Sequence, residues 1–402
     1  MLTLIRNGRL YAPDEMGKRD LLIAAGKIIK IAEKIDAPQN LDVKTVDAAG
    51  KTITPGFIDL HVHITGGGGE GGPATRVPEI QLSRITQAGV TTVLGVLGTD
   101  DVSRHPESLL AKAMALEKEG ITAYILIGSY QFPPATITGS VRKDIALIPH
   151  VLGVGEIALS DHRSSQPGFE DIAQLVAAAR VGGMLGGKAG IVQFHMGSGQ
   201  RGLEYLFRLV KETEIPISQI FPTHITRSRA LFEHSLRFAK MGGNVDITAS
   251  GKQLDWKISA GEAFRQFISA GVSIEQITLS SDSNGSMPIF DENGSLVRLA
   301  VGDIENLLRE FRCLVTEGDL PISEILKCIT LNPARRISID HHKGSLEEGK
   351  DADLIVFDSD WKIDRVYSRG RLMVSGGMAI VKGVFEYPVD GIINSIEKLR
   401  TN

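Results

Sequence analysis

Five residues with side chains that can bind metal ions each lie at the end of an apolar segment. His61 and His63 close FIDLHVH, His195 closes GIVQFH, His224 closes IFPTH, and Asp282 closes ITLSSD. Imidazole and carboxylate groups ligate divalent transition metals. Side chains two apart on a strand point to the same side, so the first two histidines can hold one ion. A lone histidine at a strand end is usually structural, but the repeated pattern predicts a metal site.

Asp282 has two possible chemical duties. It can ligate a metal, and it can take a proton from a metal-activated water and pass it to a leaving amine. Two ions ~3.5–4 Å apart lower the pKa of a bridging water and polarise a scissile carbonyl. The alternative is a helix N-cap within SSDSNG, which would leave the histidines upstream unexplained.

Other polar residues near the same strand ends could bind a charged substrate. Glu70 lies in the glycine-rich loop 66–72 and could hold an ammonium group. The loop is no P-loop, because no Gly-Lys-Ser/Thr follows it. Arg163 in SDHRSS and Arg227 in THITRSR could bind carboxylates through their guanidinium forks. Tyr130 in GSYQFPP could donate its hydroxyl to a developing oxyanion.

The apolar segments that end in these residues alternate with segments of helical periodicity. The segments of strand length are FIDLHVHI, VTTVLGVLG, ITAYILIGS, VLGVGEIAL, GIVQFHMG, ISQIFPTHI, NVDITAS and ITLSSDS. Helical stretches between them include PESLLAKAMALEKEG and EDIAQLVAAARVGGML. The repeats predict an α/β fold, a (β/α)8 TIM-type barrel with its catalytic groups at the C-terminal strand ends. A doubly wound open sheet is the alternative, and the repeat number argues against it.

The sequence pattern differs at both chain ends, where short segments of strand character are separated by turn signals such as Asn7-Gly8. We expect a small β-sandwich domain from residues 1–54 and 344–392, a barrel from 55–343 and a C-terminal tail from 393–402.

The composition excludes several classes of protein. The chain has 402 residues, 42% of them hydrophobic, and a net charge of −4, which gives no footprint for nucleic acid. No apolar run is long enough for a membrane span and no signal peptide is evident. Cys313 and Cys328 form no CxxC pattern, so we expect reduced thiols in a cytoplasmic protein.

The motifs PGFIDLHVHITGGGGEGGP, SDHRS, FHMG, PTHITR and LSSDSNGS resemble the isoaspartyl dipeptidase family of the amidohydrolase superfamily. The tail motif KGSLEEGKDADLIVFD is similar to the superfamily in general. The resemblance implies hydrolysis of the isopeptide bond of β-aspartyl dipeptides by a hydroxide that bridges two divalent ions, for which we expect zinc. It also implies a homo-oligomer, with an octamer as one candidate state.

The resemblance also implies roles for individual residues. Five would be metal ligands, the first three for one ion and the last two for the other: His61, His63, Asp282, His195 and His224. Asp282 would also be the general base and acid, and Tyr130 would polarise the carbonyl. Glu70 would hold the substrate ammonium. The remaining residues would hold or assist in holding carboxylates: Arg163, Arg227, Ser286, Thr99 and the backbone of Gly68.

The chain departs from this family at the ligand that should bridge the metals. In the family a carboxylated lysine ends the fourth barrel strand, whereas VLGVGEIALSDHR contains no lysine. Counting back from SDHR assigns Glu156 to that place, and counting forward from VLGV assigns Gly155. We expect Glu156 to bridge both ions, with an extra residue that forms a bulge and moves the shorter side chain inward.

Two other classes of function remain open from the sequence. The chain could be another amidohydrolase, such as a cyclic amidase or an N-acyl amino acid deacylase. It could also be a non-catalytic scaffold on the same fold, although such a protein would be expected to lose metal ligands.

Overall fold

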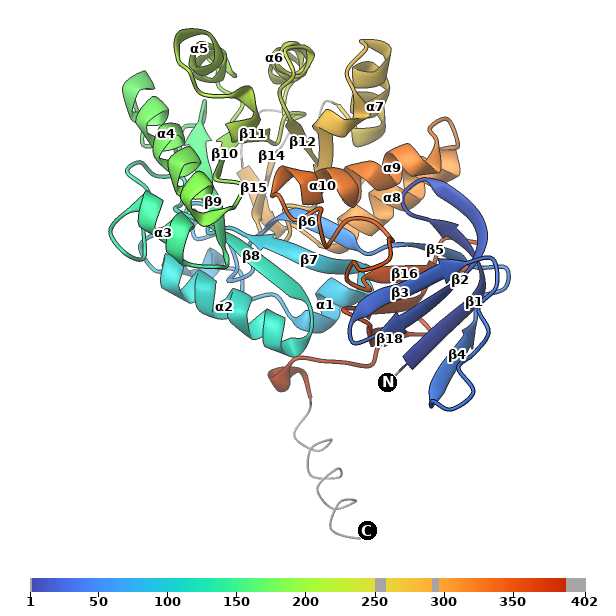
Figure 1. The fold of residues 1–402 in the computed structure, drawn as a ribbon. Coiled ribbons are helices and arrows are strands. Elements are labelled where there is room, and N and C mark those ends of the chain that lie inside the picture. Colours follow the sequence, from blue (N-terminus) through green and yellow to red (C-terminus); the bar gives the residue numbers. More distant parts are fainter. Residues whose placement is uncertain (1, 250–257, 291–295, 388–402) are drawn as a thin grey trace, which may run out of the picture.

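The computed structural model of the protein describes residues 2–249, 258–290 and 296–387 (Figure 1). The tail expected at 393–402 and the last part of the predicted small domain, 388–392, lie outside the described residues. Among the described residues, none of the helices has the length and apolar character that crossing a bilayer requires.

A ring of parallel strands forms the centre of the molecule. Its strands are β6 (Phe57–Val62), β7 (Val90–Gly95), β8 (Thr122–Ile127), β9 (Val151–Leu159), β10 (Ile191–Met196), β11 (Ile220–Thr223), β12 (Val245–Thr248) and β13 (Ile277–Ser280). Strands β6 to β11 form one sheet in chain order, and β12 pairs with β13. β11 lies beside β12, and β13 lies beside β6, where Val62 forms a bridge with Ser283. The predicted TIM-type barrel is confirmed.

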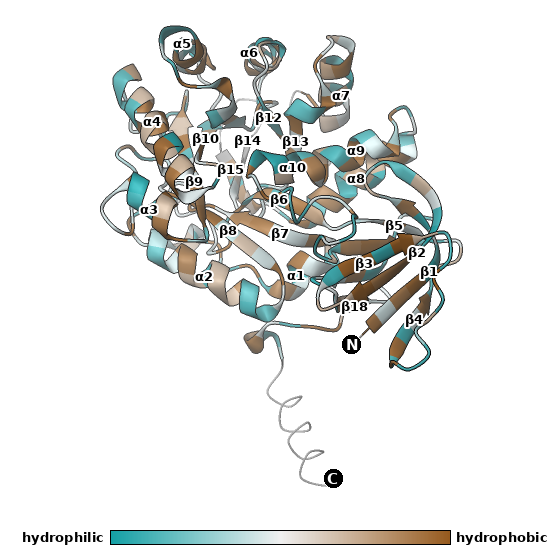
Figure 2. Cartoon of the chain, in the orientation of Figure 1, coloured by the Kyte–Doolittle hydropathy of each residue, from teal (hydrophilic) through white to brown (hydrophobic). Residues whose placement is uncertain are grey.

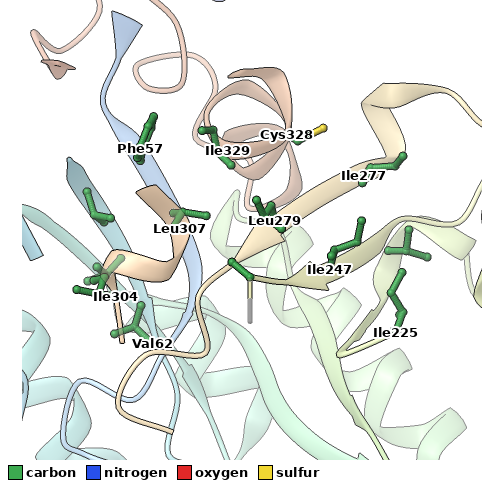
Figure 3. Close-up of a cluster of buried hydrophobic side chains, with 14 of the residues drawn as sticks. Phe57, Val62, Ile225, Ile247, Ile277, Leu279, Ile304, Leu307, Cys328 and Ile329 are labelled. Carbon is green, nitrogen blue, oxygen red and sulfur yellow. The ribbon is translucent and has the colours of Figure 1, made fainter. Parts of the chain in front are cut away.

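Helices surround the barrel on its outer side (Figure 1). Apart from α10 (Leu331–Arg336), which packs at the N-terminal end of the barrel, they are α1 (Leu82–Gln87), α2 (Pro106–Glu119), α3 (Val141–Leu147), α4 (Phe169–Gly186), α5 (Glu204–Glu212), α6 (Arg229–Lys240), α7 (Ala260–Ser269), α8 (Glu305–Glu317) and α9 (Ile322–Ile329). Each turns apolar residues inward, which gives the alternating colours along the helices in Figure 2. Figure 3 shows Leu307 of α8 and Ile329 of α9 packed near Phe57 and Leu279 of the barrel strands.

The N-terminal end of the barrel is closed by apolar side chains. Ala334 of α10, with Ile337 and Ile339 that follow it, packs with Leu60 and Phe221 inside the ring. Access to the barrel interior is therefore at the opposite, C-terminal ends of the strands.

A second sheet is built from both ends of the chain, coloured blue and red in Figure 1. It contains β1 (Leu2–Tyr11), β2 (Glu15–Ala24), β3 (Lys27–Ala32), β4 (Val43–Asp47), β5 (Thr52–Pro55), β16 (Leu354–Phe357), β17 (Ile363–Ser368), β18 (Arg371–Ser375) and β19 (Met378–Ala379). The antiparallel pairing of β5 with β16 joins the two ends. The expected β-sandwich is not confirmed, because these nine strands hydrogen-bond as one sheet. A hairpin of β14 (Ser286–Phe290) and β15 (Leu296–Val301) follows the barrel.

An aromatic cluster attaches the small sheet to the barrel. The ring of Phe311 in α8 lies 5.3 Å from that of Phe57 in β6 and 5.5 Å from that of Phe357 in β16. Trp361 completes the cluster, 5.5 Å from Phe311. Its contacts fix the start of β6, the strand that carries His61.

Removing the central ring of this cluster should destabilise the protein. We expect Phe311→Ala to lower the free energy of unfolding by about 3–5 kcal/mol, since it leaves a cavity among buried rings. Phe385→Ala is the matched control, because Phe385 is 98% exposed. Denaturant unfolding of both variants measures the difference, and equal effects would contradict this account of the cluster.

Candidate active site

Six buried side chains converge at the C-terminal mouth of the barrel. They lie in or directly after five of the eight barrel strands, β6, β9, β10, β11 and β13: His61, His63, Glu156, His195, His224 and Asp282. Their nitrogen and oxygen atoms form three overlapping triplets, each with all atoms within 4.8 Å of one another. The triplets are His61–His63–Glu156, His61–His224–Asp282 and Glu156–His195–His224.

The carboxylate of Glu156 lies at the centre of the imidazoles. Its Oε2 is 2.9 Å from Nδ1 of His195, 3.3 Å from Nε2 of His61 and 3.6 Å from Nε2 of His224. Its Oε1 is 3.5 Å from Nε2 of His63. One carboxylate therefore reaches both the first histidine pair and the second.

An irregularity in β9 accompanies this placement of Glu156. Val154 pairs with Val192 of β10, but Ile157 pairs with Phe194, so β9 contains one residue more than β10 between the two pairs. β9 is thus irregular next to Glu156, while the extra residue relative to the family remains a prediction from the sequence. A Cβ on Gly155 would lie 2.9 Å from Cβ of Gln193, so glycine permits this close approach of the strands.

Asp282 approaches the cluster from the closing strand. Its Oδ1 lies 3.2 Å from Nε2 of His63 and 3.6 Å from Nε2 of His61. Asp282 and His224 both adopt left-handed backbone conformations, with φ of +52° and +61°. Such conformations cost free energy in residues other than glycine and concentrate at functional sites.

The cluster has the charge and the unsatisfied atoms that suit a bound cation. Both ring nitrogens of His61 and Oε1 of Glu156 are buried without a hydrogen-bond partner in the described part of the chain. Burial opposes ionisation of Glu156, but the neighbouring imidazoles outweigh it and hold its pKa well below the usual range. Burial likewise opposes the imidazolium form of His61, yet the Glu156 carboxylate raises its pKa to about 9. A divalent ion would satisfy Nε2 of His61 and Oε1 of Glu156 and would balance the buried carboxylates.

An ion pair lies at one edge of this metal-ligand cluster. Nη1 of Arg163 is 3.2 Å from Oε1 of Glu70, and Oγ1 of Thr99 donates a hydrogen bond to the same oxygen at 3.3 Å. The groups expected to bind opposite charges of a substrate therefore face one another. The loop that carries Glu70 is anchored by a bridge between Gly68 and Arg76.

Arg227 and Tyr130 both contact His195. Nη1 of Arg227 lies 2.6 Å from Nε2 of His195, and the Tyr130 ring is centred 4.2 Å from the imidazole. The guanidinium of Arg163 lies over the same tyrosine ring at 5.0 Å. Burial, with the Glu156 charge adding to it, raises the pKa of Tyr130 well above its ordinary value, so its hydroxyl remains a proton donor. Ser286 is partly exposed at the start of β14.

The structure adds residues to which the sequence analysis assigned no role. Thr248 Oγ1 lies 2.8 Å from Nδ1 of His224 and orients that ring. Asp161 contacts Arg163 and His195. Asp161 is a carboxylate shortly after a barrel strand, the same signal that selected Asp282, so the sequence could have indicated it.

Comparison with known proteins gives the class of this chain. The model of the amidohydrolase family matches residues 52–373, and the chain belongs to that family. A curated dihydroorotase of Anaeromyxobacter sp. (strain K) is 25% identical over 91% of this chain and 92% of its own length. A solved D-hydantoinase, 16% identical with a TM-score of 0.67, shares the fold.

Within the family, the chain is similar to a β-aspartyl dipeptidase from Fervidobacterium islandicum AW-1. A structure of that enzyme in complex with the β-Asp-Leu dipeptide is 46% identical, with a TM-score of 0.88 over 94% of this chain and 98% of the other. A second structure of the enzyme is 44% identical, with a TM-score of 0.87. The resemblance to the isoaspartyl dipeptidases inferred from the motifs is confirmed.

Gly98 offers a test of the cluster that changes none of its ligands. A Cβ there would lie 2.7 Å from Cε1 of His63. We expect Gly98→Ala to displace the His63 ring and to weaken metal binding by roughly 10–100-fold, the scale seen when residues that orient ligands are changed. Gly139→Ala is the control, because Gly139 has a similar φ of +79° and open space around it. Metal content after dialysis measures both, and equal contents would refute the crowding argument.

Proposed function

We propose that this chain hydrolyses the isopeptide bond of β-aspartyl dipeptides. The observation that carries the proposal is the meeting of Glu70, Arg163 and Arg227 beside the buried cluster of metal ligands. A β-aspartyl dipeptide has one ammonium and two carboxylates, which need one acidic and several cationic partners. The β-Asp-Leu dipeptide bound to the similar enzyme from F. islandicum supports the same substrate class.

We infer that the site holds two divalent ions and that zinc suits its ligands. His61, His63 and Asp282 would hold one ion, His195 and His224 would hold the other, and Glu156 would reach both. The short contacts from Glu156 to both histidine pairs support this division. When bound, the ions supply Lewis-acid chemistry, which activates water and polarises the scissile carbonyl.

The residues of the chain divide the remaining work. Glu70 pairs with the substrate ammonium, while Arg163 and Arg227 pair with its carboxylates, assisted by Ser286, Thr99 and the Gly68 backbone. Asp282 accepts a proton from the attacking water and delivers it to the leaving amine nitrogen as the C–N bond breaks. Tyr130 donates a hydrogen bond to the oxyanion that forms on the carbonyl oxygen.

Glu70 separates this function from the alternatives. A cyclic amidase and an N-acyl amino acid deacylase act on substrates whose amine is acylated, so neither needs a carboxylate for a free ammonium group. A non-catalytic scaffold does not need six converging ligands. A homo-oligomer, such as an octamer, and a cytoplasmic location remain predictions from the sequence.

Substrate selectivity tests the proposed function directly. We expect kcat/KM to be about 10- to 100-fold higher for β-Asp-Leu than for α-Asp-Leu, because the α isomer misplaces a charged group whose hydrogen bonds contribute roughly 1.5–3 kcal/mol. Steady-state kinetics on one preparation of known metal content measures this ratio, with hydantoin as a cyclic amide control. Comparable values for the two dipeptides, or faster turnover of hydantoin, would contradict the proposal.

Removal of Glu156 tests how the metals are bridged. We expect wild-type protein prepared without bicarbonate to hold two metals per chain and to show no carboxylate adduct in its intact mass. Glu156→Ala should lose metal and activity together, since an uncompensated cluster of imidazoles remains. Glu310→Ala is the control, because Glu310 is a partly buried carboxylate in α8, outside the metal-ligand cluster. A Glu156→Ala protein with two metals and normal turnover would exclude the bridging role.

A further inference from the structure

Asp161 lies in the loop between β9 and α4 and contacts two different parts of the site. Its side chain is 5% exposed, and it belongs neither to the metal-ligand cluster nor to the residues proposed to touch substrate. Its carboxylate faces the guanidinium of Arg163 on one side and the imidazole of His195 on the other.

The contact with Arg163 is bidentate and fixes the direction of that side chain. Nε of Arg163 donates to Oδ1 of Asp161 at 2.9 Å, and Nη2 donates to Oδ2 at 2.8 Å. The backbone N–H of Arg163 also donates to Oδ1 at 2.8 Å. These bonds leave Nη1 directed at Glu70, where the proposed substrate charges would bind. Bidentate pairs of this kind add geometric specificity.

The contact with His195 bears on the position of the imidazole proton. Nδ1 of His195 faces Glu156 at 2.9 Å, so it is the nitrogen that would ligate a metal and must carry no proton. The proton of the neutral ring must then reside on Nε2. Oδ2 of Asp161 lies 3.2 Å from Nε2 and can accept that proton in a hydrogen bond.

The other neighbours of His195 favour the opposite tautomer. Nη1 of Arg227 and Nη2 of Arg163 lie 2.6 and 3.2 Å from Nε2, and guanidinium groups only donate. Glu156 at Nδ1 is an acceptor, which favours a proton on that nitrogen. Among the described residues that contact this ring, Asp161 alone can accept a hydrogen bond from Nε2.

We propose that Asp161 is a positioning residue that holds the proton of His195 on Nε2 and thereby keeps Nδ1 available for metal, while it aligns Arg163 with the substrate. This inference rests on the proposed metal-dependent hydrolysis. Carboxylate partners of metal-ligating histidines orient the ring and increase metal affinity.

Two substitutions of Asp161 distinguish tautomer selection from packing. Asp161→Ala removes the acceptor, and Asp161→Asn keeps the shape but can place an amide donor against Nε2. Selection of the tautomer predicts that zinc affinity falls about 10–100-fold in Asp161→Ala and at least as far in Asp161→Asn. A packing role predicts the reverse order, because the isosteric change disturbs packing less.

Zinc affinity is measured by chelator-buffered titration of the full chain, with circular dichroism to confirm folding. Asp144→Asn is the matched control, since Asp144 is also a buried carboxylate that accepts backbone N–H groups, and it should retain wild-type affinity. At saturating zinc, both Asp161 variants should also show a higher KM for β-Asp-Leu, because Arg163 loses its alignment.

Several outcomes would overturn the role of Asp161. They are unchanged zinc affinity in Asp161→Ala, a milder loss in Asp161→Asn than in Asp161→Ala, or an equal loss in Asp144→Asn. If Asp161→Asn does not fold, the zinc affinity of Asp161→Ala is compared with that of Asp144→Asn, and equal affinities overturn the proposal. Wild-type protein that binds zinc but does not cleave β-Asp-Leu would refute the proposed function, while the order of zinc affinities would still test the tautomer.

Discussion

The buried carboxylate of Glu156 is the constraint on which the rest of the site depends. A charge in the barrel interior is costly unless opposite charges or donors surround it, and here imidazoles from three other strands do so. Each imidazole must therefore lie within contact distance of the Glu156 carboxylate. The arrangement leaves buried nitrogens without hydrogen-bond partners, which a protein tolerates where a cation binds.

The barrel meets this constraint through the geometry of its strands. Parallel strands bring side chains from distant parts of the sequence to one mouth, while apolar side chains of α10 and the residues after it close the opposite end. β9 is a local exception to this regular geometry, because it contains one residue more than β10 between Val154 and Ile157. The absence of a side chain at Gly155 permits the close approach of the two strands there.

Outside the metal-ligand cluster, charges are paired in a way that suits exchange with a substrate. Glu70 and Arg163 form an ion pair across the mouth of the barrel. A substrate with an ammonium group and a carboxylate could replace this contact, the ammonium pairing with Glu70 and the carboxylate with Arg163. Arg227 lies beside His195, where its guanidinium could pair with a second carboxylate of the substrate. Asp161 contacts both Arg163, which would bind substrate, and His195, which would bind metal. Substrate binding and metal binding would therefore share one hydrogen-bond network.

The sequence by itself determined the barrel and most of the candidate ligands, because strand-length apolar segments and strand-end histidines such as His195 and His224 are local signals. It also indicated the substrate groups through Glu70 and the two arginines. It assigned the bridging role to Glu156 although one motif count pointed to Gly155, since the register of β9 depends on pairing with β10. It could not reveal that the strands of both chain ends form one sheet, or that Asp161 faces His195. Those features depend on contacts between segments far apart in the chain, which only the tertiary structure decides.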